Sequence, residues 1–272
     1  MSYYLLIKNM KVRGANALAC HYAISPAPIM ASNLFAHALG RALDMPHLAV
    51  AYLHHDGRYH AESDPVADFK KTVFQQRRAA TYINKDDYAQ GTTSLSLQPV
   101  ANISLKVSIV IEFAQLPDAD VARRFITQGR FAGGVIESFR DIVVFDEYDE
   151  QGFLAIPGNG YWLVDRSDCL EGDDPAQSLV EQLAKKPSSG SDENNSWLTP
   201  IVAGYSLIST PVDQLPGVRS LSDGSHPAHA FGEPLLGLAQ FVSVRAREAG
   251  LIPFWKASWV NETTYLLQQR DF

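Results

Sequence analysis

The sequence has few cysteines and lacks any long apolar run. Its two cysteines, Cys20 and Cys169, are far apart in the chain and form no disulfide framework. The longest uninterrupted apolar run covers only residues 48–53, whereas a membrane-spanning helix needs about 20 apolar residues. The first residues show neither the basic segment nor the small-residue cleavage site of a secretory signal. These absences predict a reduced, cytoplasmic protein that does not enter a membrane.

Motifs of common nucleotide-dependent and nucleophilic enzymes are also missing. The chain contains no G-x-S-x-G, no G-x-x-x-x-G-K-[ST] and no G-x-G-x-x-G after a predicted strand. No C-x-x-C or H-x-x-x-H spacing supports a closed zinc site. One group of potential metal ligands gathers around a predicted turn, but adjacent strand residues point to opposite faces. We therefore favour a polar turn over a metal site for His54, His55, Asp56, His60 and Glu62.

Positive charge is in the minority, and its distribution matters more than its total. The chain has 30 acidic and 23 basic residues, a formal charge of −7 that argues against an indiscriminate nucleic-acid binder. Residues 141–195, however, contain 13 acidic and 3 basic residues, so the remainder carries +3. The same segment holds the polar run 187–196, which predicts an exposed loop or linker.

Hydrophobic periodicity predicts alternating strands and helices in the first half of the chain. Residues 3–12 are β-rich, residues 13–28 are rich in turn formers, and residues 29–43 carry an apolar stripe at helical spacing that includes Leu34 and Phe35. Residues 48–53 predict a strand, and Asp56-Gly57 predicts a hairpin turn with its partner from Tyr59 onward.

The strongest strand signal is the alternation over residues 103–113. Pro117-Asp118 predicts a helix start, Gly129 its end, and residues 131–134 a glycine turn before a strand at 142–145. This β-α-β-β-α-β order predicts an α+β fold with a ferredoxin-like (RRM-like) palm. We expect the palm at 1–148 with an inserted β-hairpin arm at 66–98, and an acidic insert or linker at 149–196. A β-rich C-terminal extension follows at 197–272, with strands near 200–208, a helix at about 235–249 and a final strand pair.

The predicted arm combines cations with aromatic rings. Cations contact phosphates and rings stack on bases, a combination typical of proteins that bind single-stranded RNA. The cations are Lys70, Lys71, Arg77, Arg78 and Lys85, and the rings are Phe69, Phe74, Tyr82 and Tyr88.

Two histidines offer an alternative, enzymatic interpretation. A histidine near a 2′-hydroxyl could take its proton and start RNA cleavage. His21 lies in the loop before the first helix, with no acid partner nearby in sequence, and His37 lies beside the apolar stripe, where we expect a semi-buried structural role. The neighbouring Cys20 adds little to a nucleophile hypothesis.

Several sequence blocks, in a shared order from about residue 12 to 242, resemble one family. R-G-A-N-A-L at 13–18 is followed by S-P-A-P at 25–28 and F-A-H-A-L-G-R at 35–41. Further blocks are F-A-G-G-V-I at 131–136, W-L-x-P-I-x-A-G-Y at 197–205 and L-G-L at 236–238. Together they resemble the Csy-two subunits, the Cas-five-type backbone proteins of the type I-F CRISPR surveillance complex.

The resemblance implies a noncatalytic subunit without cofactors that caps the 5′ handle of the guide RNA in an antiviral ribonucleoprotein complex. A ferredoxin-like palm would hold the RNA, and the basic arm would be the thumb folded over it, since T-V-F at 72–74 and R-R at 77–78 resemble the family's thumb. Gly133 and Gly134 would allow close backbone approach. The RNA-binding residues implied are Arg13, Asn16, Lys70, Lys71, Phe74, Arg77, Arg78, Lys85, Gly133, Gly134 and Arg219.

The implied partners are the guide RNA, an adjacent backbone subunit and a large subunit that reads the protospacer-adjacent motif. The chain is shorter than a usual member, and Tyr22-Ala23-Ile24 replaces the family's T-W-G-F. One alternative is therefore a variant complex in which this subunit contacts target DNA itself. Another alternative is a protein-only assembly adaptor. In each RNA-binding interpretation, we expect the acidic segment to face away from the RNA.

Overall fold

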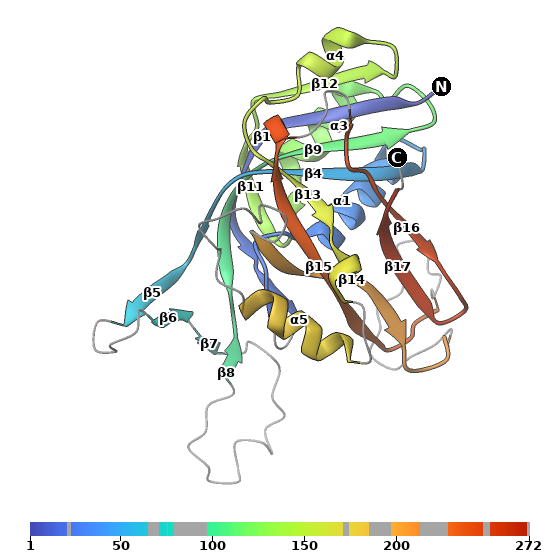
Figure 1. The fold of residues 1–272 in the computed structure, drawn as a ribbon. Helices are drawn as coiled ribbons and strands as arrows, with labels where there is room; N and C mark the ends of the chain where they lie inside the picture. Colours follow the sequence, from blue (N-terminus) through green and yellow to red (C-terminus); the bar gives the residue numbers. More distant parts are fainter. Residues whose placement is uncertain are drawn as a thin grey trace, which may run out of the picture.

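The computed structural model describes residues 1–20, 23–64, 71–74, 76–78, 97–170, 174–184, 197–212, 228–246 and 251–270 (Figure 1). For residues 62–99 it describes only the backbone of the strands. The described chain is mixed α/β, and most of its strands join one large antiparallel sheet. None of the described helices is long and apolar enough to span a membrane.

The first half of the chain builds a four-strand core of this sheet in the order β12–β1–β9–β4, with antiparallel neighbours. Helix α1 connects β1 to β4, and α3 connects β9 to β12 through the short β10–β11 hairpin that also pairs with the end of β1. The elements are β1 (Tyr3–Asn16), α1 (Ile29–Ala42), β4 (His47–Tyr59), β9 (Asn102–Phe113), α3 (Ala119–Gln128), β10 (Arg130–Phe131), β11 (Gly134–Ser138) and β12 (Asp141–Asp146).

The second half adds five strands in the order β13–β15–β14–β17–β16. Both outer strands of this group pair with the same edge of β4, through Trp162 opposite Leu53 and Trp255 opposite Val50. The added strands therefore close into a ring with β4. They are β13 (Tyr161–Asp165), β14 (Leu198–Leu207), β15 (Gly232–Ser243), β16 (Trp255–Trp259) and β17 (Thr264–Gln269).

Short elements connect these strands. Segment 149–196 was expected as an insert or linker. It contributes β13 to the large sheet, between β4 and β15, and also forms three short helices. The short elements are β2 (Leu18–Cys20), β3 (Ala23–Ile24), α4 (Glu150–Leu154), the 3₁₀ turns η1 (Ser167–Leu170) and η3 (Val244–Ala246), and α5 (Pro175–Ala184). Cys20 and Cys169 are both free.

Two hydrophobic clusters lie on opposite faces of the sheet. Alternate residues of β1, β4 and β9 face α1 in the larger cluster, which includes Leu5, Val50 and Ile109. Their neighbours face the other side, where Leu6 and Val110 pack in the smaller cluster. Because both faces of the central strands are covered there, β9 alternates in burial at its start and is buried throughout its second half.

Four predicted elements are confirmed in type and nearly in extent, as are the strands predicted at 142–145 (β12) and near 200–208 (β14). The strand at 3–12, the helix at 29–43, the strand at 103–113 and the helix after Pro117 correspond to β1, α1, β9 and α3. The α3 start has a clear cause, since the Asp118 carboxylate accepts hydrogen bonds from the backbone of Asp120 at 2.8 Å and of Val121 at 3.0 Å. Gly129 ends the helix, as predicted.

The hairpin turn predicted at Asp56-Gly57 is wrong. Strand β4 runs through both residues to Tyr59 and pairs with β9 along this length, with an irregularity in register between His54 and Asp56. Pairing with β9 outweighs the local turn preference of these residues, so β4 contains a bulge here instead of a turn.

Two further predictions are wrong. The helix expected at 235–249 is largely β15, because residues 232–243 pair with β14 on one edge and β13 on the other. The loop expected at 13–28 contains the last residues of β1 and the short strands β2 and β3.

Where the arm was expected at 66–98, two consecutive strand pairs lie within residues 61–99. Strand β5 (Ala61–Asp64) pairs with β6 (Lys71–Phe74), and β7 (Gln76–Arg78) pairs with β8 (Leu97–Pro99). Figure 1 shows these four strands projecting from the shared end of β4 and β9.

A buried ion pair joins the C-terminal region to β9. The Glu112 carboxylate lies 2.8 Å from Arg270 Nη1 and also accepts a hydrogen bond from Ser2 Oγ at 2.9 Å. We predict that Arg270→Met lowers the free energy of unfolding by about 2 kcal/mol, because it leaves the Glu112 charge buried without its cationic partner. Urea unfolding measures the loss. Arg270 is 37% exposed, which keeps the expected loss below that of a fully enclosed pair. The double variant Glu112→Gln with Arg270→Met should be more stable than Arg270→Met alone, and an additive double-mutant cycle would contradict the assignment.

Candidate nucleic-acid interface

The structure brings together four of the predicted RNA-binding residues at the end of β1. Arg13 and Asn16 are in the last part of this strand. Gly133 lies in the β10–β11 turn beside it, and Gly134 is the first residue of β11. The Asn16 backbone N–H donates to the Ala132 carbonyl at 2.8 Å, and Arg13 lies opposite Val135 in register. Arg13 and Asn16 were expected in a loop, and the backbone pairing instead holds them in a strand.

The two glycines of this turn have different surroundings. Gly133 is exposed, adopts a positive φ of +78° and would have no atom within 4 Å of an added Cβ. Gly134 is buried, and an added Cβ would lie 2.6 Å from the Ala15 backbone nitrogen. The close approach that we expected from RNA is therefore made at Gly134 by β1, and only Gly133 presents open backbone to solvent.

Arg13 lies at the rim of this region with its side chain 68% exposed. Its Nε is 3.0 Å from Glu137 Oε1 on β11. An exposed pair of this kind contributes little to stability, so the guanidinium can exchange its carboxylate for a phosphate at low cost.

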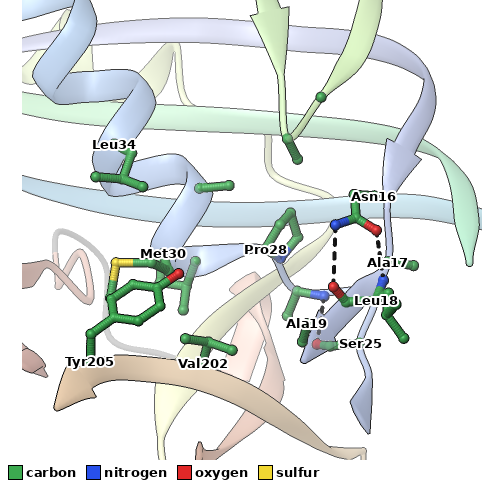
Figure 2. Close-up of a pocket in the computed structure, with 15 residues that line it drawn as sticks. Asn16, Ala17, Leu18, Ala19, Ser25, Pro28, Met30, Leu34, Val202 and Tyr205 are labelled. Carbon is green, nitrogen blue, oxygen red and sulfur yellow. Dashed lines mark hydrogen bonds between the residues drawn. The ribbon is translucent and has the colours of Figure 1, made fainter. Parts of the chain in front are cut away.

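Beside Asn16 the chain forms a cavity of about 330 Å³ (Figure 2). The Asn16 side chain is held at its edge, because its amide nitrogen donates to the Leu18 carbonyl at 3.2 Å and its oxygen accepts from the Leu18 backbone at 3.0 Å. Ala132 and Gly133 form part of the same wall, so the β10–β11 turn opens directly onto the cavity.

The other walls come from distant parts of the chain. Met30 and Leu34 of α1 face Val202 and Tyr205 of β14, and Figure 2 shows the Tyr205 ring against Met30. Burial raises the pKa of the Tyr205 hydroxyl, which keeps it a neutral donor and acceptor at physiological pH. Apolar walls with a few polar groups at the edge suit a flat, partly polar ligand such as a nucleobase.

No pattern in the sequence predicts the cavity. The predicted apolar stripe placed Leu34 in the core, whereas Leu34 is 49% exposed at the cavity. Tyr205 belongs to the W-L-x-P-I-x-A-G-Y block, which was the one signal that could have pointed to β14. Only the folded chain places these residues beside Asn16.

Other predicted RNA-binding residues are not at this cavity or are outside the described residues. Lys71 and Phe74 are in β6, and Arg77 and Arg78 are in β7, where the structure describes their backbone alone. Lys70, Lys85 and Arg219 lie outside the described residues, as does His21.

The expectation of a semi-buried His37 is wrong, because this residue is exposed on α1. Its ring centroid is 6.0 Å from that of His47. His47 is half-buried, and its Nε2 donates to Asn33 Oδ1 at 2.9 Å. Burial, with a smaller contribution from His37, lowers the pKa of His47 to about 4.

The histidines near the predicted turn of β4 are engaged separately. His54 packs against Phe241 with ring centroids 4.9 Å apart, while His55 Nε2 contacts Ser108 Oγ at 2.7 Å on the opposite face. His60 Nε2 contacts Ser104 Oγ at 2.8 Å. Among the described residues, no three His, Cys, Asp or Glu side chains gather as metal ligands would.

The glycine geometry predicts a difference between two alanine substitutions. Gly134→Ala should lower the free energy of unfolding by about 2–3 kcal/mol, because the added methyl group meets the β1 backbone. Gly133→Ala should cost about 1 kcal/mol through its positive φ. Gly158→Ala is the control, since an added Cβ there has no neighbour within 4 Å. Urea unfolding of the three variants tests the ranking, and equal losses would contradict it.

The His47 environment predicts a pH dependence. The folded-state pKa of about 4 lies below the ordinary value of 6.5, so the unfolded chain binds the proton more tightly. The difference in the pKa of His47 between the two states adds to the free energy of unfolding. This contribution is complete above pH 6.5 and is lost as the pH falls toward 4. His47→Gln, which keeps a donor for Asn33, should flatten the change in unfolding midpoint over that range. An unchanged profile would show that another group controls it.

Comparison with known proteins agrees with the sequence motifs. No curated protein matches the chain. The family model described as CRISPR-associated protein (Cas_Csy2) matches residues 5–187. This match covers more than half of the chain and includes β1, α1, the arm, β9 and the β10–β11 turn. The chain therefore belongs to the Cas_Csy2 family, the Csy2-type subunits of type I-F CRISPR complexes.

Proposed function

We propose that this protein is the noncatalytic subunit that binds and caps the 5′ handle of the guide RNA. The observation that carries the proposal is the convergence of Asn16 and Gly133, from separate family-like blocks, on one cavity of about 330 Å³, which is large enough to admit a nucleobase. Arg13 stands at the same end of β1 with an exposed guanidinium. A base in the cavity and a neighbouring phosphate at Arg13 would together hold an unpaired strand at this end of β1.

We further propose that the first half of the chain is a ferredoxin-like palm and that the arm is its thumb. The strand order β12–β1–β9–β4, with α1 and α3 as crossovers, supports the palm. The projection of β5–β8 from the end of β4 and β9 supports the thumb (Figure 1). In this arrangement Lys70, Lys71, Phe74, Arg77, Arg78 and Lys85 would close over the RNA from the arm, and Arg219 would approach it from the segment after β14.

The position of acidic residues supports the same orientation. Asp146 lies opposite Tyr3 at the start of β1, and α4 follows it with Asp149 at its N-cap. Asn16 is at the other end of this 14-residue strand, at most about 43 Å away at roughly 3.3 Å per residue. We propose that this acidic end faces away from the RNA and toward a protein neighbour, either the adjacent backbone subunit or a large subunit.

The thumb assignment predicts that Arg77→Glu with Arg78→Glu abolishes co-purification of guide RNA with the assembled complex, because reversed charges repel phosphates. The ratio of absorbance at 260 nm to that at 280 nm, together with a denaturing gel of the bound RNA, measures occupancy. Arg41→Glu with Lys256→Glu is the control, since it changes net charge equally at exposed positions on α1 and β16.

Full RNA occupancy in the arm variant would overturn the thumb assignment. A wild-type complex without any excess absorbance at 260 nm would overturn RNA binding altogether and would support a protein-only adaptor.

A further inference from the structure

Among the residues that the structure describes, an apolar cluster covers one half of the sheet face opposite α1. At one end of this face, Leu6, Leu53 and Val110 are buried beneath Trp162 and Phe254. Toward the ends of β1 and β4, the same face becomes polar. On β9, Lys106 lies between Leu105 and Val107, which are buried on the side of α1. Its side chain therefore lies on the opposite face.

Four cations share the polar half of this face, and we call them the open-face patch: Lys11, Arg13, Arg58 and Lys106. Lys11 and Arg13 flank Val12, which packs in the α1 cluster, so both project from the opposite side of β1. Arg58 lies opposite Ser104, two residues from Lys106. Lys11, Arg13 and Arg58 are exposed, and Lys106 is half-buried.

Two of these cations oppose each other directly. Lys11 and Lys106 are partners in the β1–β9 register, an arrangement that destabilises a sheet when both charges are alike. Within the described residues, neither lysine forms a salt bridge. The described part of this face has two carboxylates. Glu137 is paired with Arg13, and Asp56 lies opposite Lys106 in the strand register. The patch therefore keeps an excess of positive charge on three adjacent strands.

The neighbouring His55 does not change the net positive charge of the patch. His55 lies beside Lys106 where the covered half begins, bonded to Ser108. Burial lowers the pKa of His55 to about 4, with smaller lowering contributions from Lys106 and His54 and an opposing one from the Asn159 backbone. His55 is therefore neutral at physiological pH and supplies no charge of either sign to the patch.

We propose that the open-face patch binds the phosphodiester backbone of single-stranded nucleic acid, as a site that shares Arg13 with the proposed handle contact but does not include the Asn16 cavity. Neighbouring strands lie about 4.8 Å apart, so cations on β1, β9 and β4 cover a width of roughly 10 Å and can meet successive phosphates. The described side chains at the centre of this patch are polar and charged and supply no apolar anchor for a protein, whereas a polyanion neutralises the opposed lysines. Strands β4 and β9 lead from the patch directly into the arm, so a bound strand continues toward β6 and β7.

Fluorescence anisotropy with the full-length chain and a labelled 12-nucleotide oligouridine tests the site. Lys11→Gln with Lys106→Gln should weaken binding about tenfold at 100 mM salt and reduce the slope of log affinity against log salt by about 1.4, or about 0.7 for each lost phosphate contact. The same variant should unfold at an equal or higher urea concentration, because the opposed charges are gone. Lys11→Arg with Lys106→Arg should retain the affinity.

The control is Arg41→Gln with Lys256→Gln, which removes the same net charge from α1 and β16. Unchanged affinity and slope in the patch variant, or an equal loss in the control, would overturn the site. An oligothymidine of the same length tests whether the patch distinguishes RNA from DNA. An equal loss of affinity for both probes assigns the contact to any single strand. A loss of affinity for the RNA probe alone assigns it to the guide RNA. Because neither probe carries a repeat sequence, failure here leaves the proposed handle binding standing.

Discussion

Strand β4 is the element on which the rest of the structure depends, because both of its edges are paired. Along one edge it pairs with β9 as far as Tyr59, and along the other it pairs with β16 at Val50 and with β13 at Leu53 and His54. Its central residues, Ala49 to Leu53, are 0% exposed. A strand that belongs to both the core sheet and the C-terminal ring keeps the two halves of the chain from moving as independent bodies.

The same constraint explains where the candidate site lies. Closing the ring onto β4 brings β14 against α1, as the hydrogen bond from Asn33 Nδ2 to Tyr265 Oη and the pairing of Tyr265 with Tyr205 indicate. The cavity at Asn16 occupies the junction, with α1 and the β10–β11 turn on one side and β14 on the other. The family match ends at residue 187, yet β14 supplies part of the wall.

The sequence predicted the elements whose signals are local and overlooked the features that depend on distant pairing. The alternation of β9 and the Asp118 and Gly129 caps of α3 are encoded within a few residues, and the structure confirms them. Asp56-Gly57 and residues 235–249 carry local preferences for a turn and a helix, but neighbouring strands impose extended backbone on both. At the candidate site, Arg13, Asn16 and the glycines came from motif resemblance, whereas Tyr205 required knowledge of which strand closes against α1.

The composition of the cavity has a consequence for the order of events in the cell. Its walls are formed by residues near position 16, near position 30 and in the β10–β11 turn, and finally by Val202 and Tyr205. A ribosome must therefore have released about three quarters of the chain before the cavity can exist. A nascent or truncated chain that has folded only its first strands lacks the β14 wall that would enclose a base. Ligand binding at this cavity is therefore expected only after β14 has been synthesised.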